Sequence, residues 1–106
     1  MIESDKIKEI VDKIIKAVDP EKIILFGSYA NGTANKHSDL DLCVVVDEKS
    51  DRNFVYEKLA DTLWEFLIPV DIIIYSQTDF YEWQNVKMAF PTIIMRTGKI
   101  LYEKQK

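Results

Sequence analysis

The sequence predicts an α/β domain in which a small mixed β-sheet is covered by helices. Short apolar runs of the length of buried strands alternate with longer segments whose apolar residues recur at helical spacing. Proline or glycine stands near most of the boundaries, where these residues interrupt regular backbone. A length of 106 residues with 47% hydrophobic and 30% charged residues is typical of a globular chain with one core. We therefore expect a single domain over residues 1–106.

The first segment predicts an amphipathic helix followed directly by a strand over residues 22–26. Ser4 is the expected N-cap of the helix. The helix should end near Asp19, because Pro20 disfavours helical backbone in the residue before it. The apolar residues that share one helical face are Ile7, Ile10, Val11, Ile14 and Val18.

The middle of the chain predicts a second strand, a second helix and a third strand. The second strand is opened by acidic residues and runs on through residues 43–46. The polar cluster over residues 47–51 predicts a turn and the start of a helix that reaches about Leu67, before Pro69 stops it. The third strand covers residues 70–75, and its isoleucine run is apolar enough that we expect it to be buried.

The last quarter of the sequence predicts an aromatic-rich helix from Asp79 to about Phe90, with Thr78 as its N-cap. Pro91 is expected to break this helix, and residues 92–96 extend or restart it. A short final strand is expected over residues 99–102.

Charge and cysteine content exclude several classes of function. With a formal net charge of −4 and a sequence pI of about 4.9, the average field of the chain does not attract nucleic acid. The sole cysteine, Cys43, excludes an internal disulfide and a cysteine-based zinc cluster, and its place deep in a strand predicts a buried structural thiol. The sequence has neither the apolar region of a signal peptide nor a membrane-spanning run, so we expect a cytoplasmic protein.

The polar stretch between the first two strands is the candidate functional site. Gly27 permits a tight turn, and Ser28 is expected to cap a short helix whose free N–H groups suit a phosphate. Asp39 and Asp41 open the second strand, where alternate residues share a face and lie roughly 6.5 Å apart. Two carboxylates at that distance repel each other unless a cation lies between them. This arrangement predicts a triphosphate at the turn and a metal at the aspartates.

Asp71 is the one acid within the otherwise apolar third strand. Acids are seldom placed in such a run without a partner, so either the strand end is wet or the acid has a function. If the third strand lies beside the second, Asp71 completes a site of three carboxylates with Asp39 and Asp41.

Other phosphate-binding and hydrolase motifs fit less well. Gly27 and Gly32 match the glycine spacing of a Walker A loop, but the lysine that this loop needs is missing. Ser28 lacks the Gly-x-Ser-x-Gly turn of a hydrolase nucleophile, and the sole histidine, His37, lies in a polar loop where it is expected to be solvated.

The joint arrangement of these motifs strongly resembles the minimal nucleotidyltransferases of the polymerase-beta superfamily. The resemblance rests on Gly-Ser at the end of one strand, Ser-Asp-Leu-Asp-Leu over residues 38–42, and Val-Asp-Ile over residues 70–72. It extends over the whole chain, including Gly-Lys-Ile-Leu-Tyr over residues 98–102. It implies a polymerase-beta-like nucleotidyltransferase fold.

The resemblance also implies a role for each site residue. Gly27 and Ser28 would hold the phosphates of the nucleotide, and Ser38 would belong to the same nucleotide site. Many relatives carry arginine in the turn where this chain has Tyr29 and Asn31, which leaves neutralisation of the phosphates to metal and to a nearby lysine at position 36. The donor implied is ATP.

The three aspartates are the implied catalytic and metal-binding residues. Asp39 and Asp41 would ligate magnesium, as a pair of Mg²⁺ ions, and Asp71 would bind metal or accept the proton of the attacking hydroxyl. Phosphoryl transfer needs positioning and neutralisation of charge more than covalent chemistry, which agrees with a site of three acids.

The chain is short for an enzyme that binds its own acceptor, so we expect the acceptor to dock from outside. Minimal nucleotidyltransferases of this kind resemble antitoxins whose partner, from a neighbouring gene, is a helical HEPN-domain ribonuclease toxin. The implied reaction transfers AMP from ATP to a tyrosine hydroxyl of that toxin and silences it. Direct nucleic-acid or membrane binding is not expected.

Two alternatives remain at this stage. The chain could neutralise a partner by covering it without catalysis, or it could act on a small-molecule hydroxyl. The aromatic residues Phe80, Tyr81 and Trp83 cannot all face inward from one helix, so some of them are candidates for a partner surface.

Overall fold

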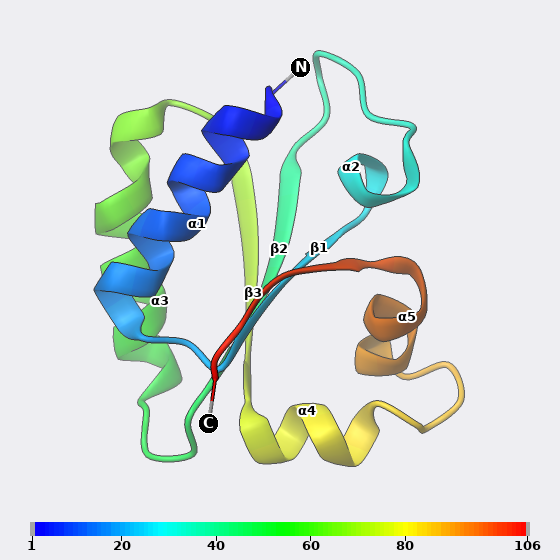
Figure 1. The fold of residues 1–106 in the computed structure, drawn as a ribbon. Coiled ribbons are helices and arrows are strands. Elements are labelled where there is room, and N and C mark those ends of the chain that lie inside the picture. Colours follow the sequence, from blue (N-terminus) through cyan, green and yellow to red (C-terminus); the bar gives the residue numbers. More distant parts are fainter. Residues whose placement is uncertain (1, 106) are drawn as a thin grey trace.

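The computed structural model describes residues 2–105. Figure 1 shows a sheet with helices on both faces. The elements in chain order are α1 (Ser4–Val18), β1 (Lys22–Phe26), α2 (Ser28–Asn31), β2 (Leu40–Val46), α3 (Arg52–Leu63), the 3₁₀ turn η1 (Trp64–Phe66), β3 (Val70–Ser76), α4 (Gln77–Trp83), α5 (Phe90–Thr97) and β4 (Lys99–Glu103). The predicted α/β class and the small mixed sheet are confirmed.

The sheet has four strands in the order β3-β2-β1-β4. β1 is antiparallel to both β2 and β4, whereas β2 and β3 run parallel. In this register Asp41 lies opposite Phe26 on β1 and opposite Asp71 on β3. One end of the sheet therefore brings together, in a single row, residues that are far apart in the sequence.

One face of the sheet is packed along its whole length by α1 and α3 (Figure 1). Alternate residues of β2 from Leu40 to Val46 point to this face and are buried, together with Ile23 and Leu25 of β1. The buried residues that the two helices contribute are Ile10, Val11, Ile14, Val55, Leu59 and Leu63.

The opposite face is covered by α4 and α5 over only part of its length. Its core consists of Ile24, Cys43, Val45, Phe80 and Ile94. The row of residues beyond Ile24 and Cys43 contains Phe26 and Asp41, neither of which is fully buried. This uncovered end of the second face is where the candidate site lies.

The first helix and strand lie where the sequence predicts them, with one difference at the start. Glu3, not Ser4, occupies the N-cap of α1, and its carbonyl accepts hydrogen bonds from the N–H groups of Lys6 and Ile7. Ser4 is the first helical residue, so its predicted role as the cap is wrong. At the other end Asp19 adopts a left-handed conformation with φ 46° before Pro20.

The second helix ends earlier than predicted. Asp51 caps α3 by accepting hydrogen bonds from the N–H groups of Asn53 and Phe54. The α-helix stops at Leu63 and gives way to the 3₁₀ turn, after which Leu67 has φ 54°. The expected extent to Leu67 therefore includes a turn that is not α-helical.

Contrary to the prediction, the isoleucine run of the third strand is only partly buried. The reason is topological, because β3 is an edge strand whose partner within residues 2–105 is β2 alone. An apolar run does not by itself distinguish a central strand from an edge strand.

The C-terminal helices begin at other residues than predicted. Ser76, not Thr78, is the N-cap of α4, and its Oγ accepts a hydrogen bond from the N–H of Asp79 at 3.1 Å. α4 ends at Trp83, and Pro91 lies in the first turn of α5 instead of breaking a helix. Proline is well tolerated there, because the first turn has no helical acceptor for an N–H.

Among residues 2–105, no helix has the length and apolar character that crossing a bilayer requires.

Candidate active site

Gly27 lies against the carboxylate of Asp41. Its backbone has φ 73° and ψ −153°, a conformation that residues with a Cβ rarely adopt. A Cβ placed on Gly27 would lie 2.2 Å from Oδ2 of Asp41. Glycine is therefore required here both by the turn and by the close approach of the carboxylate.

The turn at Gly27 leads into the short helix α2. Gly27 itself stands at the N-cap, and its carbonyl accepts hydrogen bonds from the N–H groups of Ala30 and Asn31. Ser28 is the first helical residue, so the prediction that its side chain caps the helix is wrong. The helix starts one residue earlier because glycine can adopt the positive-φ backbone that leads into it.

Asp41 and Asp71 meet across the parallel strands β2 and β3. Partial burial raises the pKa of the Asp41 carboxyl above its usual range, and the charges of Asp71 and Asp39 raise it further. A side-chain hydrogen bond with Asp71 acts in the same direction. Two carboxyl groups placed together in this way repel each other when both are ionised, so the pair favours a cation between them.

Asp39 lies at the margin of this pair. β2 begins at Leu40, so Asp39 directly precedes the strand, and its side chain is exposed. Its charge nevertheless contributes to the raised pKa of Asp41. The structure thus brings Asp41 and Asp71 into contact and leaves Asp39 near them at the solvent-exposed strand end.

The donor set fits a hard divalent cation only in part. Carboxylate oxygens are the ligands that Mg²⁺ prefers, and Asp41 and Asp71 supply them at a point of unrelieved negative charge. Among the residues that the structure describes, no three His, Cys, Asp or Glu side chains are grouped so that they could hold one metal ion. The pair is therefore the candidate centre of a metal site.

The loop before β2 is closed by local hydrogen bonds. Oγ of Ser38 accepts a hydrogen bond from the N–H of Asn35 at 2.9 Å, and Oδ1 of Asn35 accepts one from the N–H of His37 at 2.8 Å. Lys36 and His37 are exposed, as expected for His37. Ser38 thus shapes the loop that leads to Asp39.

A family model described as nucleotidyltransferase domain matches residues 4–95. This match covers the Gly-Ser turn and all three aspartates. The chain belongs to the nucleotidyltransferase domain family. The resemblance predicted from the sequence, and with it a nucleotidyltransferase activity, is thereby confirmed.

Three known proteins are similar to this chain in sequence or in structure. A Methanocaldococcus jannaschii protein assigned as a protein adenylyltransferase is 30% identical over 77% of this chain and 78% of its own. The protein MntA of Haemophilus influenzae, with the same assignment, is 29% identical over 92% of this chain and 80% of its own. A toxin–antitoxin structure solved with AMP-PNP has a TM-score of 0.59 and 26% identity, over 92% of this chain and 74% of that one.

Tyr29 has a structural role in this nucleotidyltransferase. Its hydroxyl accepts a hydrogen bond from the backbone N–H of Ile2 at 2.9 Å, which ties the start of the chain to α2. The side chain also packs against the core on the α1 and α3 side of the sheet. The residue that stands in the Gly-Ser turn is thus used for packing.

Cys43 lies one row deeper than Asp41 on the same face. It is fully buried, and burial raises the pKa of its thiol to about 12. A thiol with this pKa is not a nucleophile near neutral pH, so the prediction of a buried structural cysteine is confirmed.

Sequence reasoning missed one aromatic contact beside the carboxylates. The rings of Phe26 and Phe90 meet with centroids 5.5 Å apart and an interplanar angle of 87°. Phe26 directly precedes Gly27, which is a signal in the sequence, but Phe90 lies more than 60 residues later and nothing local connects it to the site. The site therefore combines a glycine turn, a carboxylate pair and an aromatic wall.

Proposed function

We propose that this nucleotidyltransferase is an antitoxin that transfers AMP from ATP, with Mg²⁺, to a tyrosine hydroxyl of a HEPN-domain ribonuclease toxin. The observation that carries the proposal is the meeting of Asp41 and Asp71 beside Gly27 at the uncovered end of the sheet. The assignments of the two relatives as protein adenylyltransferases and the similarity to a toxin–antitoxin structure with AMP-PNP support it.

The proposed reaction is an in-line displacement at the α-phosphorus of ATP. The tyrosine oxygen forms a bond to that phosphorus, and the bond to the bridging oxygen of the β-phosphate breaks, so that pyrophosphate leaves. The hydroxyl proton passes to the carboxylate of Asp71. Such a reaction depends chiefly on positioning and on neutralisation of phosphate charge.

Asp39, Asp41 and Asp71 are the proposed magnesium ligands. Bound Mg²⁺ would neutralise charge on the phosphate oxygens and on the departing pyrophosphate. The carboxylate of Asp41 lies against the backbone of Gly27, so close that a side chain at position 27 would collide with it. Asp39, exposed at the strand end, is free to supply a further oxygen.

The nucleotide phosphates are proposed to bind at the turn. Gly27 lets them approach the backbone closely, and Ser28 offers the first N–H and a hydroxyl of α2. Ser38 fixes the opposite loop through its hydrogen bond with Asn35. Lys36 is the exposed cation of that loop.

The acceptor is proposed to be a protein from a neighbouring gene that docks from outside. Tyr81 and Trp83 of α4 are 40% and 50% exposed, whereas Phe80 between them and the sheet is buried. Exposed aromatic side chains are enriched at protein interfaces. We expect this meeting of enzyme and acceptor to take place in the cytoplasm.

The test is the intact mass of the product of that neighbouring gene after incubation with this protein, ATP and MgCl₂. We expect a gain of whole AMP units, and no gain with Asp41→Ala. The matched control is Asp61→Ala, which removes one exposed acid from α3, a helix that packs on the opposite face of the sheet, and should leave the gain unchanged. Peptide mapping then identifies the modified side chain.

A second experiment tests the alternative that the chain neutralises its partner by covering it without catalysis. The variant that combines Asp39→Ala with Asp41→Ala is compared in cells with Asp12→Ala combined with Asp61→Ala, which removes the same charge from α1 and α3. Catalytic neutralisation requires that only the first pair fails to protect at equal protein level. Protection by both pairs, with a stable complex, would favour covering without catalysis. Transfer to a small hydroxyl compound without any partner would favour the third alternative.

A further inference from the structure

An aromatic pair lies directly beside the carboxylates. Phe26 is the register partner of Asp41 across β1 and β2, so the two side chains share one face of the sheet. The ring of Phe26 meets that of Phe90 in the edge-to-face contact described above. The pair therefore forms a continuous apolar wall from the carboxylates to the first residue of α5.

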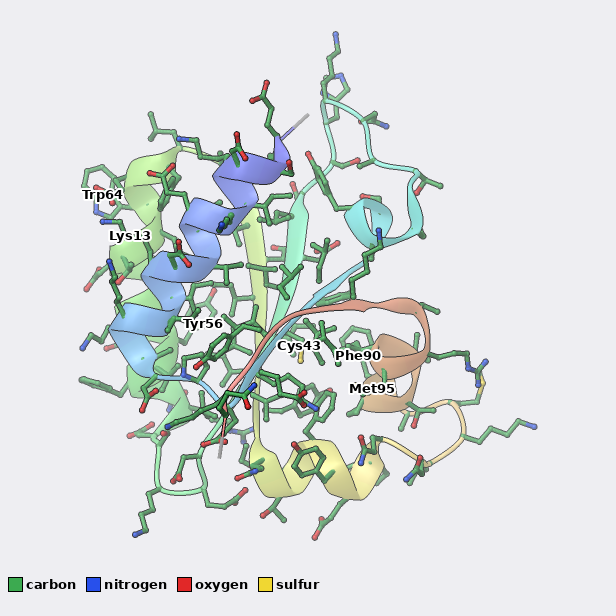
Figure 2. All side chains as sticks on the ribbon, in the orientation of Figure 1. Lys13, Cys43, Tyr56, Trp64, Phe90 and Met95 are labelled. Carbon is green, nitrogen blue, oxygen red and sulfur yellow. The ribbon has the colours of Figure 1, made fainter. Side chains whose placement is uncertain are left out.

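Part of this wall is open to solvent. Phe90 is 40% exposed, whereas Phe80, which covers the same sheet face from α4, is fully buried. Figure 2 shows Phe90 extending from α5 towards the sheet, on the side where Cys43 lies. An edge-to-face contact occupies one face of only one of its two rings, so aromatic surface remains available beside the site.

We propose that Phe90, backed by Phe26, is the subsite for the base of the nucleotide and makes the site prefer purines. The inference rests on the proposed function, because it places the base relative to an α-phosphate at Asp41 and Asp71. From that phosphate the base is one ribose away. The apolar ring next to Asp41 in the strand register is that of Phe26, and the ring of Phe90 continues it away from the carboxylates.

The chemistry of stacking sets the expected selectivity. Every base has a π face, so a stacking wall accepts any base, but the larger purine ring system covers more of it. Phe90 presents a hydrocarbon ring and no polar atom that could read a base edge. The wall should therefore favour ATP and GTP over CTP without separating ATP from GTP.

The experiment is calorimetric titration of the protein with ATP, GTP, CTP and inorganic tripolyphosphate, each in MgCl₂. The variants are Phe90→Leu, which keeps an apolar side chain but removes the aromatic face, and Phe90→Trp, which enlarges that face. Ile93→Leu is the matched control, because Ile93 lies on the same helix and is also 40% exposed. Thermal melts of each variant check that the fold is retained.

We expect Phe90→Leu to weaken ATP and GTP binding roughly ten-fold, the usual scale for one stacked base, and CTP binding less. Tripolyphosphate has no base, so its binding should be unchanged in this variant. Phe90→Trp should bind ATP as tightly as the native chain or more tightly. Ile93→Leu should bind all four probes as the native chain does.

Three outcomes would overturn the inference, and they are distinguishable. If the native chain binds ATP and tripolyphosphate, and Phe90→Leu binds ATP equally well, the base subsite is wrong while the phosphate and carboxylate site stands. Equal loss of ATP and tripolyphosphate in Phe90→Leu would also overturn it, since the effect would then not concern the base. If the native chain binds neither probe, the proposed nucleotidyl transfer fails and the base subsite fails with it.

Discussion

The two faces of the sheet are built differently although the same strands make both. On the face covered by α1 and α3, every residue of β2 from Leu40 to Val46 that points inward is apolar and buried. On the other face the corresponding series along the strand is Asp41, Cys43 and Val45, and burial begins only at Cys43. The first face is buried along the whole strand, whereas the second face is buried only from Cys43 onward.

The difference teaches where chemistry can be placed in so small a fold. Carboxylates at the covered end of the second face would have to be desolvated by α4 and α5, at a large cost in free energy. At the uncovered end Asp41 is only partly buried, enough to raise its pKa and strengthen its interaction with Asp71, but still open to substrate. A site is therefore possible because α4 and α5 do not extend over this end of the sheet.

The largest expected effect comes from removing the cover of the second face. Phe80 is fully buried and contacts the rings of Tyr75 and Tyr81, so Phe80→Ala leaves a large cavity over the strands. We expect the free energy of unfolding to fall by about 3–5 kcal/mol, measured by urea denaturation. Glu82→Ala, an exposed change on the same helix, should alter it by less than about 0.5 kcal/mol. A loss below about 1 kcal/mol for Phe80→Ala would mean that α4 contributes little to this core.

The next largest effect compares two glycines that both have positive φ. Gly27 and Gly32 have φ 73° and 82°, but a Cβ at Gly27 would meet Asp41, whereas one at Gly32 has nothing within 4 Å. Gly32→Ala should therefore cost about 1 kcal/mol through backbone strain alone. Gly27→Ala should cost about 2–3 kcal/mol, because a steric clash is added to that strain.

A double-mutant cycle isolates the contact between turn and carboxylate. In a chain that already carries Asp41→Ala, the cost of Gly27→Ala should fall, because the clashing atom is gone and only the backbone strain at Gly27 remains. Equal costs of Gly27→Ala in both backgrounds, measured by chemical denaturation, would show that Asp41 does not press against the turn.

The sequence predicts the first strand better than it predicts the helix starts. The strand over residues 22–26 is predicted to the residue, since Pro20 and Gly27 bound a short apolar run. Helix starts are predicted less well. Ser4, Ser28 and Thr78 are all suitable N-caps by residue type, yet each helix begins before the position they would need. Cap choice depends on backbone conformation, which residue type alone does not determine.

The candidate site is predictable in its local parts and not in its long-range ones. The local parts can be recognised from short spacings in the sequence. Gly27 and Ser28 are adjacent in a turn that suits a phosphate, and Asp39 and Asp41 are two residues apart, so that both carboxylates are expected on one face of a strand. The contact of Asp41 with Asp71 depends on parallel pairing of β2 with β3, for which the sequence offers only the presence of an acid in a strand. Phe90 contacts Phe26 because α5 packs back against the sheet, and no local pattern in the sequence predicts this packing.

An effect confined to alkaline pH should appear in the pH dependence of stability, through Cys43. Burial raises the pKa of this thiol from 9.0 to about 12, so between these values the folded chain holds a proton that the unfolded chain releases. The stabilising effect is fully present below pH 9 and is lost as the pH rises. The contribution of the thiol should fall by about 1.4 kcal/mol per pH unit. Other groups also titrate in this range, so the measurement is the difference in slope between the native chain and Cys43→Ala. If stability falls with pH at the same slope in the native chain and in Cys43→Ala, the thiol is not shielded from water.

The smallest expected effect has the opposite sign and concerns the uncovered end. Asp41→Asn keeps the shape that packs against Gly27 but removes the charge that Asp71 and Asp39 oppose. Because the raised pKa of Asp41 means that ionisation is disfavoured in the folded state, its effect on stability is unfavourable above its usual titration range and disappears in acid. Without added metal at neutral pH, Asp41→Asn should therefore be more stable than the native chain by less than about 1 kcal/mol, since solvent screens the repulsion. The same comparison near pH 3 should show no gain.

A variant that is less stable at neutral pH would mean that Asp41 is held by favourable contacts that the carboxylate pair does not account for. A gain in stability together with lost transfer would show that this end of the sheet is maintained for its chemistry at the expense of folding.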